Sequence, residues 1–448
     1  MAQDLSALTA QLLDAAKRAG AQAADVVAVD GTSVSIDVRA GALEHAERSE
    51  GVDIGLRVLI GKRQACVSAS DTREETLTTM AERAVAMARM APEDPFIGLA
   101  DASQLAQDRD TCVLELFDPT EEPSPAELQD DAARAEAAAL GIDGVTKVQS
   151  ASAAYGRRRI QIAASNGFSG SYMRSDRMTS CVAIAGDGST MERDYCGESR
   201  VFQTDLPTPE DIGMLAGRRT VERVGARKPK TGSYPVLYDE RISSSLIGHL
   251  LGAVNGASIA RGSSWLRDAL GEFVLPASLS ITEHPHRKRV TASRLFDGEG
   301  LPTKERTIVE NGRLMGWTLD LASARKLGMD STANAARGVS SPPSPSLSNV
   351  ALTQGEKSRE DLISEMGTGL LVTSMIGSTI NPTTGDYSRG AAGFWVENGE
   401  IAYAVNECTI AGNLREMLGS LIPANDARTH LSTVVPSLLV EGMTLAGD

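Results

Sequence analysis

The sequence predicts an α+β protein in which an N-terminal domain of antiparallel strands and long helices precedes a C-terminal strand-rich domain with one buried helix near its start. In the first half, segments with helical spacing of apolar residues alternate with segments of β-type alternation. Gly, Pro and Lys interrupt both patterns in GARKPKTGSYP, residues 225–235. The chain of 448 residues is also longer than one core usually supports, given about 150 residues per domain. We therefore expect domains at 1–225 and 226–448.

The first domain opens with a predicted amphipathic helix over residues 4–19, in which Leu, Leu, Leu and Ala recur at helical spacing. Three strand-like stretches follow at 26–30, 33–47 and 51–70, and Gly-containing turns are expected between them. The segment 72–90 then reads as a long helix whose early acidic residues suit the positive end of the helix dipole. These elements predict a meander of strands covered by helices.

The same order recurs further along the domain. Residues 126–140 are predicted to be helical, residues 157–186 form strands around an Asn166-Gly167 turn, and residues 209–226 form a helix that starts with proline. This recurrence suggests a loose internal duplication of helix, strands and helix. The alternative is that any layered α+β fold produces such alternation.

The second domain begins with a strand and the apolar helix SLIGHLLGAVNG, residues 245–256, and continues with strands. Two hairpins, at 307–319 and 394–405, share the words Val-Glu-Asn-Gly, and Asn-Gly between alternating runs is the strongest short hairpin signal. The stretch RGVSSPPSPSLSN, residues 337–349, is expected to hold neither a strand ladder nor a helix. A loop of that length often lines a groove or a partner surface.

Composition excludes several classes of function. The formal net charge of −15 disfavours nucleic acid as a partner, because that affinity comes mainly from Lys and Arg on phosphates. No apolar stretch approaches the roughly 18 residues of a membrane helix, and the N-terminal helix lacks the apolar region of a signal peptide. The five cysteines are odd in number and contain no CxxC, as expected of reduced thiols. We expect a cytoplasmic protein with no membrane or nucleic-acid partner.

His249 decides whether the apolar helix could hold a metal ion. A helix that binds zinc needs two ligands on one face, but Ala253 and Val254 occupy the positions four and five residues after His249. Leu250 stands where a zinc protease would carry its catalytic glutamate. We therefore interpret His249 as a core histidine.

Other catalytic templates are weak in this sequence. His284 and His286 flank a proline that makes ligation from a helix implausible, although two such imidazoles could share a metal on an extended strand. Cys408 has no histidine nearby in sequence to act as its base. Asp297 and Glu299 lie in the Gly-rich turn FDGEG, where they could bind a cation or a peptide amine or could simply be solvated.

The C-terminal half resembles the TldD/PmbA family, on the PmbA (TldE) side. The resemblance is carried by the segments SSSLIGHLLGAVNGASIARGSSWLRDALGE, RLFDGEGLPT, IVENGRLMGWTLDLASARKLG, INPTTGDYSRGAAGFWVENGEI and ECTIAGNLREM, and its most specific part is GDYSRG at 385–390. The N-terminal order of GVDIGLRVLIGKR followed by a helix fits the same family.

This resemblance implies a heterodimeric zinc peptidase that degrades or trims unfolded peptides, in which the TldD-type subunit carries an HExxxH helix and a cysteine ligand. In this chain the corresponding helix reads HLLGAV, and the last twenty residues contain no cysteine. We expect a non-catalytic subunit with no cofactor of its own, whose zinc resides in a TldD-type partner. The family is also named as a modulator of DNA gyrase, which we do not interpret as DNA contact, given the acidic balance.

Two alternatives stay open. The chain could be a cryptic metallopeptidase acting alone, with ligands from dispersed His284, His286, Glu299 or Cys408, or a homodimer that binds peptides without hydrolysing them. Polar residues beside glycine let another backbone approach closely, which makes them candidates for a peptide groove or an interface. These candidates are Asp297, Glu299, Asp386, Tyr387, Ser388 and Arg389.

Overall fold

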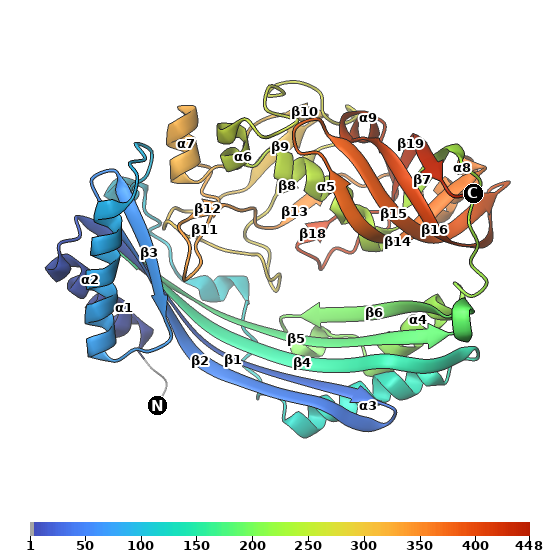
Figure 1. The fold of residues 1–448 in the computed structure, drawn as a ribbon, viewed down its shortest axis with the longest axis horizontal. Helices are drawn as coiled ribbons and strands as arrows, with labels where there is room; N and C mark the ends of the chain where they lie inside the picture. The colour runs from blue at the N-terminus through green and yellow to red at the C-terminus, as the bar shows by residue number, and fades with distance from the viewer. Residues whose placement is uncertain (1–3) are drawn as a thin grey trace.

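One six-stranded antiparallel sheet spans the N-terminal half of the computed structural model, which describes residues 4–448 (Figure 1). Its strands lie in the order β3-β2-β1-β4-β5-β6. Their bounds are β1 Ala23–Arg39, β2 Ala42–Ile60, β3 Arg63–Ala69, β4 Val145–Ala164, β5 Ser169–Ala185 and β6 Glu192–Arg200. The two central strands, β1 and β4, come from the two sets of elements and pair with each other.

Four helices cover one face of this sheet. They are α1 Leu5–Ala19, α2 Glu74–Met90, α3 Pro125–Leu140 and α4 Pro209–Val221. Asp4 caps α1 by accepting hydrogen bonds from two backbone N–H groups, and Ser124 and Thr208 cap α3 and α4, each ahead of a proline at the first helical position. Val26 and Ala28 of β1 pack with α1 and α2, whereas Val34 and Ile36 further along the strand pack with α3 and α4.

The strands are longer than the sequence predicts. The expected turns at Gly31 and Gly51 are wrong, because β1 and β2 run straight through these glycines, which pair with each other. Gly31 also faces Arg158 of β4, so that it is held from both sides. A glycine weakens a strand locally because it has no side chain to pack. Here the strands that pair with Gly31 on both sides hold it in place.

The C-terminal half contains a small closed barrel and a second, flatter sheet. The barrel sheet has the order β16-β15-β14-β7-β19-β17, and a further pairing of β16 with β19 closes it. Its strands are β7 Gly232–Tyr238, β14 Gly369–Ile380, β15 Asp386–Glu397, β16 Glu400–Asn413, β17 Ile422–Pro423 and β19 Leu438–Ala446. The flatter sheet has the order β10-β9-β8-β13-β18, formed by β8 Ile281–Glu283, β9 Arg306–Glu310, β10 Arg313–Leu314, β13 Val350–Leu352 and β18 Thr433–Val434. Both Asn-Gly hairpins form as predicted, with positive φ at each Asn and Gly.

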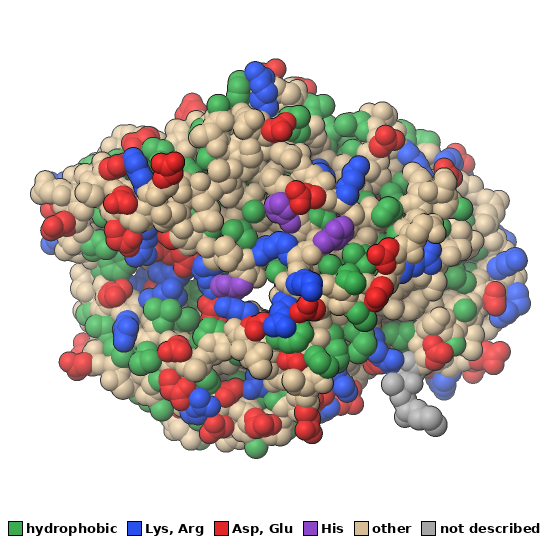
Figure 2. Space-filling view, turned by 180° about the vertical axis from the view of Figure 1, so that it is seen from behind, with side chains coloured by type: hydrophobic (Ala, Val, Ile, Leu, Met, Phe, Trp, Pro, Cys, Tyr) green, Lys and Arg blue, Asp and Glu red, His purple; other side chains and the backbone are tan. Residues whose placement is uncertain are grey.

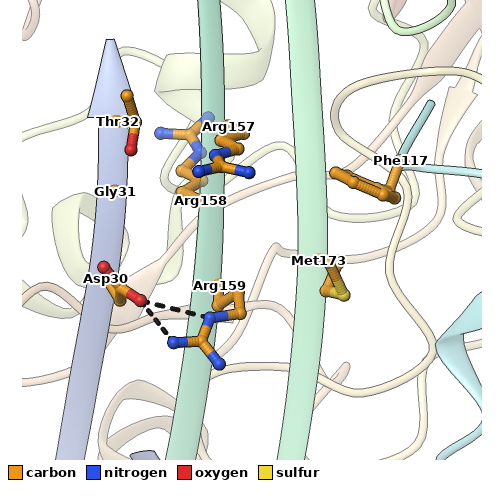
Figure 3. A pocket seen from close by; sticks show the side chains of 8 residues that line it. All are labelled: Asp30, Gly31, Thr32, Phe117, Arg157, Arg158, Arg159 and Met173. Carbon is orange, nitrogen blue, oxygen red and sulfur yellow. Dashed lines mark hydrogen bonds and ion pairs between the residues drawn. The ribbon is translucent and has the colours of Figure 1, made fainter. Parts of the chain in front are cut away.

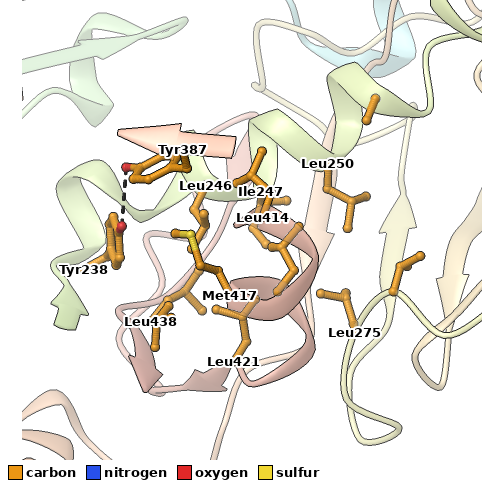
Figure 4. Packing of buried hydrophobic residues seen from close by; sticks show 14 of the residues in the cluster. Tyr238, Leu246, Ile247, Leu250, Leu275, Tyr387, Leu414, Met417, Leu421 and Leu438 are labelled. Atoms are coloured by element: carbon orange, nitrogen blue, oxygen red, sulfur yellow. Dashed lines mark hydrogen bonds between the residues drawn. The ribbon is translucent and has the colours of Figure 1, made fainter. Parts of the chain in front are cut away.

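The largest core of the chain lies in this half and is built around one helix. The helices here are α5 Glu240–Ala253, α6 Gly256–Arg261, α7 Leu321–Leu327, α8 Arg359–Met366 and α9 Leu414–Gly419. Leu246, Ile247 and Leu250 of α5 point into a cluster that includes Leu414 and Leu438 (Figure 4). The fold class is therefore confirmed as α+β with a strand-rich C-terminal half and one buried helix near its start. No helix within residues 4–448 is long and apolar enough to cross a membrane.

The loop 337–349 joins the two halves. The expectation that it holds no ladder needs one correction, because β12 Ser344–Pro345 pairs with β11 Ala335–Ala336 over two residues. Val339 lies directly on β2, where a Cβ on Gly55 would sit 1.9 Å from its carbonyl oxygen. Beside it, Arg337 Nε donates to Asp25 Oδ1 at 2.8 Å, and Arg57 pairs with the same carboxylate. The loop thus carries a buried ion pair from one half into the sheet of the other.

Candidate functional site

Helix α5 places His249 beside strand β15. Asp239 caps the helix by accepting from the Arg241 N–H at 3.2 Å, and the leucine-rich face then fixes the rotation of the helix by packing into the core. This rotation brings the His249 ring edge-on to Tyr387, with 5.8 Å between ring centroids. The sequence predicts a core histidine; the structure places His249 half-buried at the edge of the core, and its aromatic neighbour comes from a distant strand.

His249 has an unusual polar environment. Its Nε2 atom is buried and has no hydrogen-bond partner among residues 4–448. Burial, with a smaller contribution from the positive charge of Arg389, lowers the pKa of His249, so the ring stays neutral around neutral pH. A neutral imidazole could ligate a metal ion, but the arginine beside it would repel a cation.

Two tyrosines complete the cluster around His249. The hydroxyls of Tyr238 on β7 and Tyr387 on β15 lie 3.3 Å apart, as Figure 4 shows, and Tyr387 Oη lies 3.4 Å from Met375 Sδ. Burial raises the pKa of both tyrosines, so neither is a ready source of phenolate. The sequence analysis did not identify Tyr238 as a site residue, because the segment YPVLYDE shows only a strand pattern and does not indicate that Tyr387 lies beside it.

The GDYSRG segment forms the start of β15. Asp386 is exposed and accepts hydrogen bonds from Thr384 Oγ1 at 2.6 Å and Asn413 Nδ2 at 3.2 Å, which lower the pKa of its carboxyl. Arg389 Nε donates to the carbonyl of Gly377 at 2.8 Å. Ser388 is half-buried between them. Asp386 thus holds a turn, whereas Arg389 bonds to the neighbouring strand β14 and its charge acts on His249.

Asp297 and Glu299 lie elsewhere, at the junction of the two halves. Asp297 is 1% exposed and accepts from the N–H groups of Glu299, Leu301 and Ala335 at 2.9 to 3.0 Å. Glu299 accepts from the Leu321 N–H at 2.9 Å, and burial together with the charge of Asp297 raises the pKa of Glu299 well above its ordinary value. Asp297 therefore organises its own loop, and the structure does not bring these two carboxyls into the His249 cluster.

The residues present do not fit a metal ion. Within residues 4–448, no three His, Cys, Asp or Glu side chains are grouped so that they could hold one. His284 and His286 take separate partners, since His284 Nδ1 lies 2.9 Å from Glu305 Oε2 and His286 Nε2 lies 3.0 Å from Thr303 Oγ1. The Cys408 thiol donates to a backbone carbonyl, and burial raises its pKa to about 11, so it is not a ready thiolate ligand.

Basic side chains gather where the surface is hollowed. Figure 2, which views the molecule from behind, shows Lys and Arg side chains around a hollow near the middle of this face, while acidic side chains are spread over the rest of it. A cavity of about 220 Å³ lies against the N-terminal sheet, with Phe117 and Met173 on one side and Arg157 nearby (Figure 3). Asp30 and Arg159 form an ion pair across its opposite side. The lining of this small cavity is therefore basic, with Arg157 and Arg158 beside the paired Arg159.

Comparisons with known proteins cover nearly the whole chain. Models of the PmbA/TldA metallopeptidase domain 1, central domain and C-terminal domain match residues 24–88, 118–224 and 231–447. Metalloprotease PmbA of Escherichia coli is 38% identical over 429 residues, which is 95% of this chain and 92% of that protein. A metalloprotease PmbA homolog of Haemophilus influenzae is 35% identical over 100% of this chain and 97% of its own length.

Solved structures share the fold over its full length. A putative modulator of DNA gyrase from Bacteroides thetaiotaomicron superposes with a TM-score of 0.91 at 27% identity, and each chain is covered completely. TldE from Thermococcus kodakarensis superposes with a TM-score of 0.84 at 20% identity, over 98% of this chain and 100% of that one, which shows the fold alone.

Proposed function

Because the chain belongs to the PmbA/TldA metallopeptidase family, we propose that it is a non-catalytic subunit of a cytoplasmic TldD-type zinc metallopeptidase complex that degrades or trims unfolded peptides. Its partner would be a TldD-type subunit, which would supply the zinc. In this proposal the present chain contributes structure and peptide contacts, and not the activated water.

The observation that carries the proposal is the donor set around α5. A catalytic zinc site needs three protein ligands and an open position for water. Within residues 4–448 His249 belongs to no group of three possible metal ligands, and the charge that acts on it is that of the Arg389 guanidinium. Without a metal to lower the pKa of bound water, the water nucleophile of a metallopeptidase is not activated at neutral pH.

Reconstitution tests this proposal. The purified chain should not cleave an unfolded reporter peptide, a TldD-type subunit alone should cleave it poorly, and the mixture should cleave it well. His249→Gln in this chain should leave cleavage by the mixture unchanged, because the ring holds no metal. The matched variant in the partner, a glutamine in place of a histidine of its HExxxH helix, should abolish cleavage.

Other outcomes would decide for the alternatives. Cleavage by the isolated chain, lost on treatment with a chelator, would identify a peptidase acting alone. A stable homodimer that ignores the partner and binds peptide without cleavage would identify a peptide-binding protein. Either result would overturn the proposed function.

A further inference from the structure

A cleft of about 810 Å³ lies where helix α4 faces the outer side of the barrel. Leu215 and Arg218 of α4 form one wall, and strands β14, β15 and β16 form the other. Ligand pockets usually measure about 300 to 1,000 Å³ and are lined by apolar groups with a few polar ones. The cleft is therefore of a size that takes a short segment of peptide.

Apolar side chains cover the barrel wall of this cleft. Leu371, Phe394 and Ala404 are direct cross-strand partners on β14, β15 and β16; Leu371 and Ala404 are buried, and Phe394 is the half-buried member of the row that a ligand can reach. Leu215 opposite is 39% exposed, and Ile401 at the rim is 51% exposed. Large apolar groups facing each other across an open space favour an apolar side chain between them.

Two arginines of α4 line the cleft without a direct ion pair among the described residues, although the charges of Asp194 and Asp239 act on Arg219. Among residues 4–448, Arg218 has no ion pair, and Arg219 only donates to the carbonyl of Tyr195 at 3.3 Å. Burial, with a smaller contribution from Arg241, lowers the pKa of Arg219. A half-buried guanidinium of this kind would gain from an anion that enters the cleft.

Buried polar atoms in the cleft also lack partners. Thr373 is 5% exposed, and its Oγ1 has no hydrogen-bond partner in the described structure. Glu240 Oε2 accepts no hydrogen bond from the described residues either, and Arg428 Nε lies 4.0 Å from it. Such atoms are costly to bury, and a bound polar ligand could satisfy them.

Strand β16 presents a mostly open edge to the same cleft. It pairs with β15 on one side along most of its length, but with β19 on the other side only over Thr409–Ala411. Over Glu400–Val405 the second edge receives, from the part of the chain that the structure describes, one backbone hydrogen bond, which runs from the Arg227 N–H to the carbonyl of Ala404 at 3.1 Å. An extended peptide can add to such an edge through backbone hydrogen bonds that do not depend on its sequence.

We propose that this cleft binds the carboxyl-terminal end of an extended peptide, with the carboxylate at Arg218 and Arg219, the last side chain between Leu215 and Phe394, and the backbone along β16. A polyphosphate fits less well, because Glu222 and Glu240 also line the cleft. The inference rests on the proposed function only in taking a peptide as the ligand. It requires neither metal nor hydrolysis in this chain.

The test is binding to the isolated full-length chain in the presence of EDTA. The probe is a fluorescein-labelled unstructured peptide ending in leucine, compared with the same peptide as its C-terminal amide. Loss of a charge-assisted contact of about 1.5 kcal/mol or more makes the amide bind about tenfold more weakly. Arg219→Gln should weaken binding of the free acid to a similar degree and abolish the preference for it.

Arg218→Gln is the second test variant; because Arg218 is exposed, this change should not disturb folding. Arg83→Gln on the exposed face of α2 is the matched control and should bind the peptide like the wild type. Bound peptide should also slow amide hydrogen exchange over Glu400–Ala404. Equal binding of acid and amide, wild-type affinity in both α4 variants, displacement by millimolar inorganic phosphate, or unchanged exchange on β16 would each overturn the proposal. Zinc bound by the isolated chain would overturn the proposed function instead, and would leave these affinities untouched.

Discussion

Replacing Arg337 with glutamine should cost about 3 kcal/mol of unfolding free energy at neutral pH. Arg337 and Arg57 share the carboxylate of Asp25, and the three side chains are only 1%, 5% and 7% exposed. Removing one partner of a buried ion pair typically costs about 3 to 5 kcal/mol, because the remaining charge is left uncompensated. We expect a cost at the lower end of this range, because Arg57 still pairs with Asp25 in the variant.

The penalty should depend on pH. Burial alone would raise the pKa of Asp25, but the charges and hydrogen bonds of Arg57 and Arg337 outweigh it and lower the pKa. A depressed carboxyl pKa contributes stability that is present above the unfolded value of about 3.9 and is lost as the pH falls through the folded pKa. The cost of Arg337→Gln should therefore be full at neutral pH and shrink in acid.

Urea unfolding followed by far-UV circular dichroism measures this cost through the midpoint and slope of the transition. Arg267→Gln is the matched control, because its pair with Asp268 is exposed and should contribute less than about 1 kcal/mol. A loss below about 1 kcal/mol for Arg337→Gln at neutral pH, or a loss that does not fall in acid, would refute the reasoning.

Three further predictions concern other features of the chain. Gly55→Ala should loosen the contact between the two halves, because its Cβ would lie 1.9 Å from the Val339 carbonyl oxygen, and limited proteolysis should then cut the 337–349 loop faster. Glu299→Gln should stabilise the protein more at about pH 8 than at about pH 5. The reason is that the raised pKa of Glu299 contributes stability that is present below the pKa of the unfolded state and is lost as the pH rises through the pKa of the folded state. Equal thermal shifts of the variant at both pH values would contradict this. Iodoacetamide should modify exposed Cys112 before buried Cys408, whose pKa is raised to about 11. Mass spectrometry of the native protein measures the order of modification, and earlier modification of Cys408 would contradict this prediction.

Local signals allowed much of the fold to be predicted. The Asn-Gly hairpins and the capped helices depend on a few adjacent residues, whose conformational demands are visible in the sequence. Gly31 misled the prediction because its place inside β1 depends on strands that pair with it from both sides. Secondary structure that rests on such tertiary support cannot be obtained from the local pattern.

The site was harder to predict than the fold. The apolar helix around His249 indicated a core position, and the structure places the ring half-buried at the edge of the core. The neighbours Tyr387 and Arg389 come from another strand, and Arg337 meets Asp25 across 312 residues of sequence. No spacing rule connects residues at such separations. The sequence analysis therefore gives Asp297 and Asp386 together as candidates for one groove or interface, although the structure places them in different parts of the chain's C-terminal half.

The most direct test of the account is the zinc content of the purified chain before and after it joins a TldD-type subunit. We expect well under about 0.1 zinc per isolated chain, and zinc in the assembled complex at about the stoichiometry of the partner's HExxxH site. About one tightly bound zinc in the isolated chain, lost when His249 or the pair His284 and His286 is replaced, would contradict the central claim.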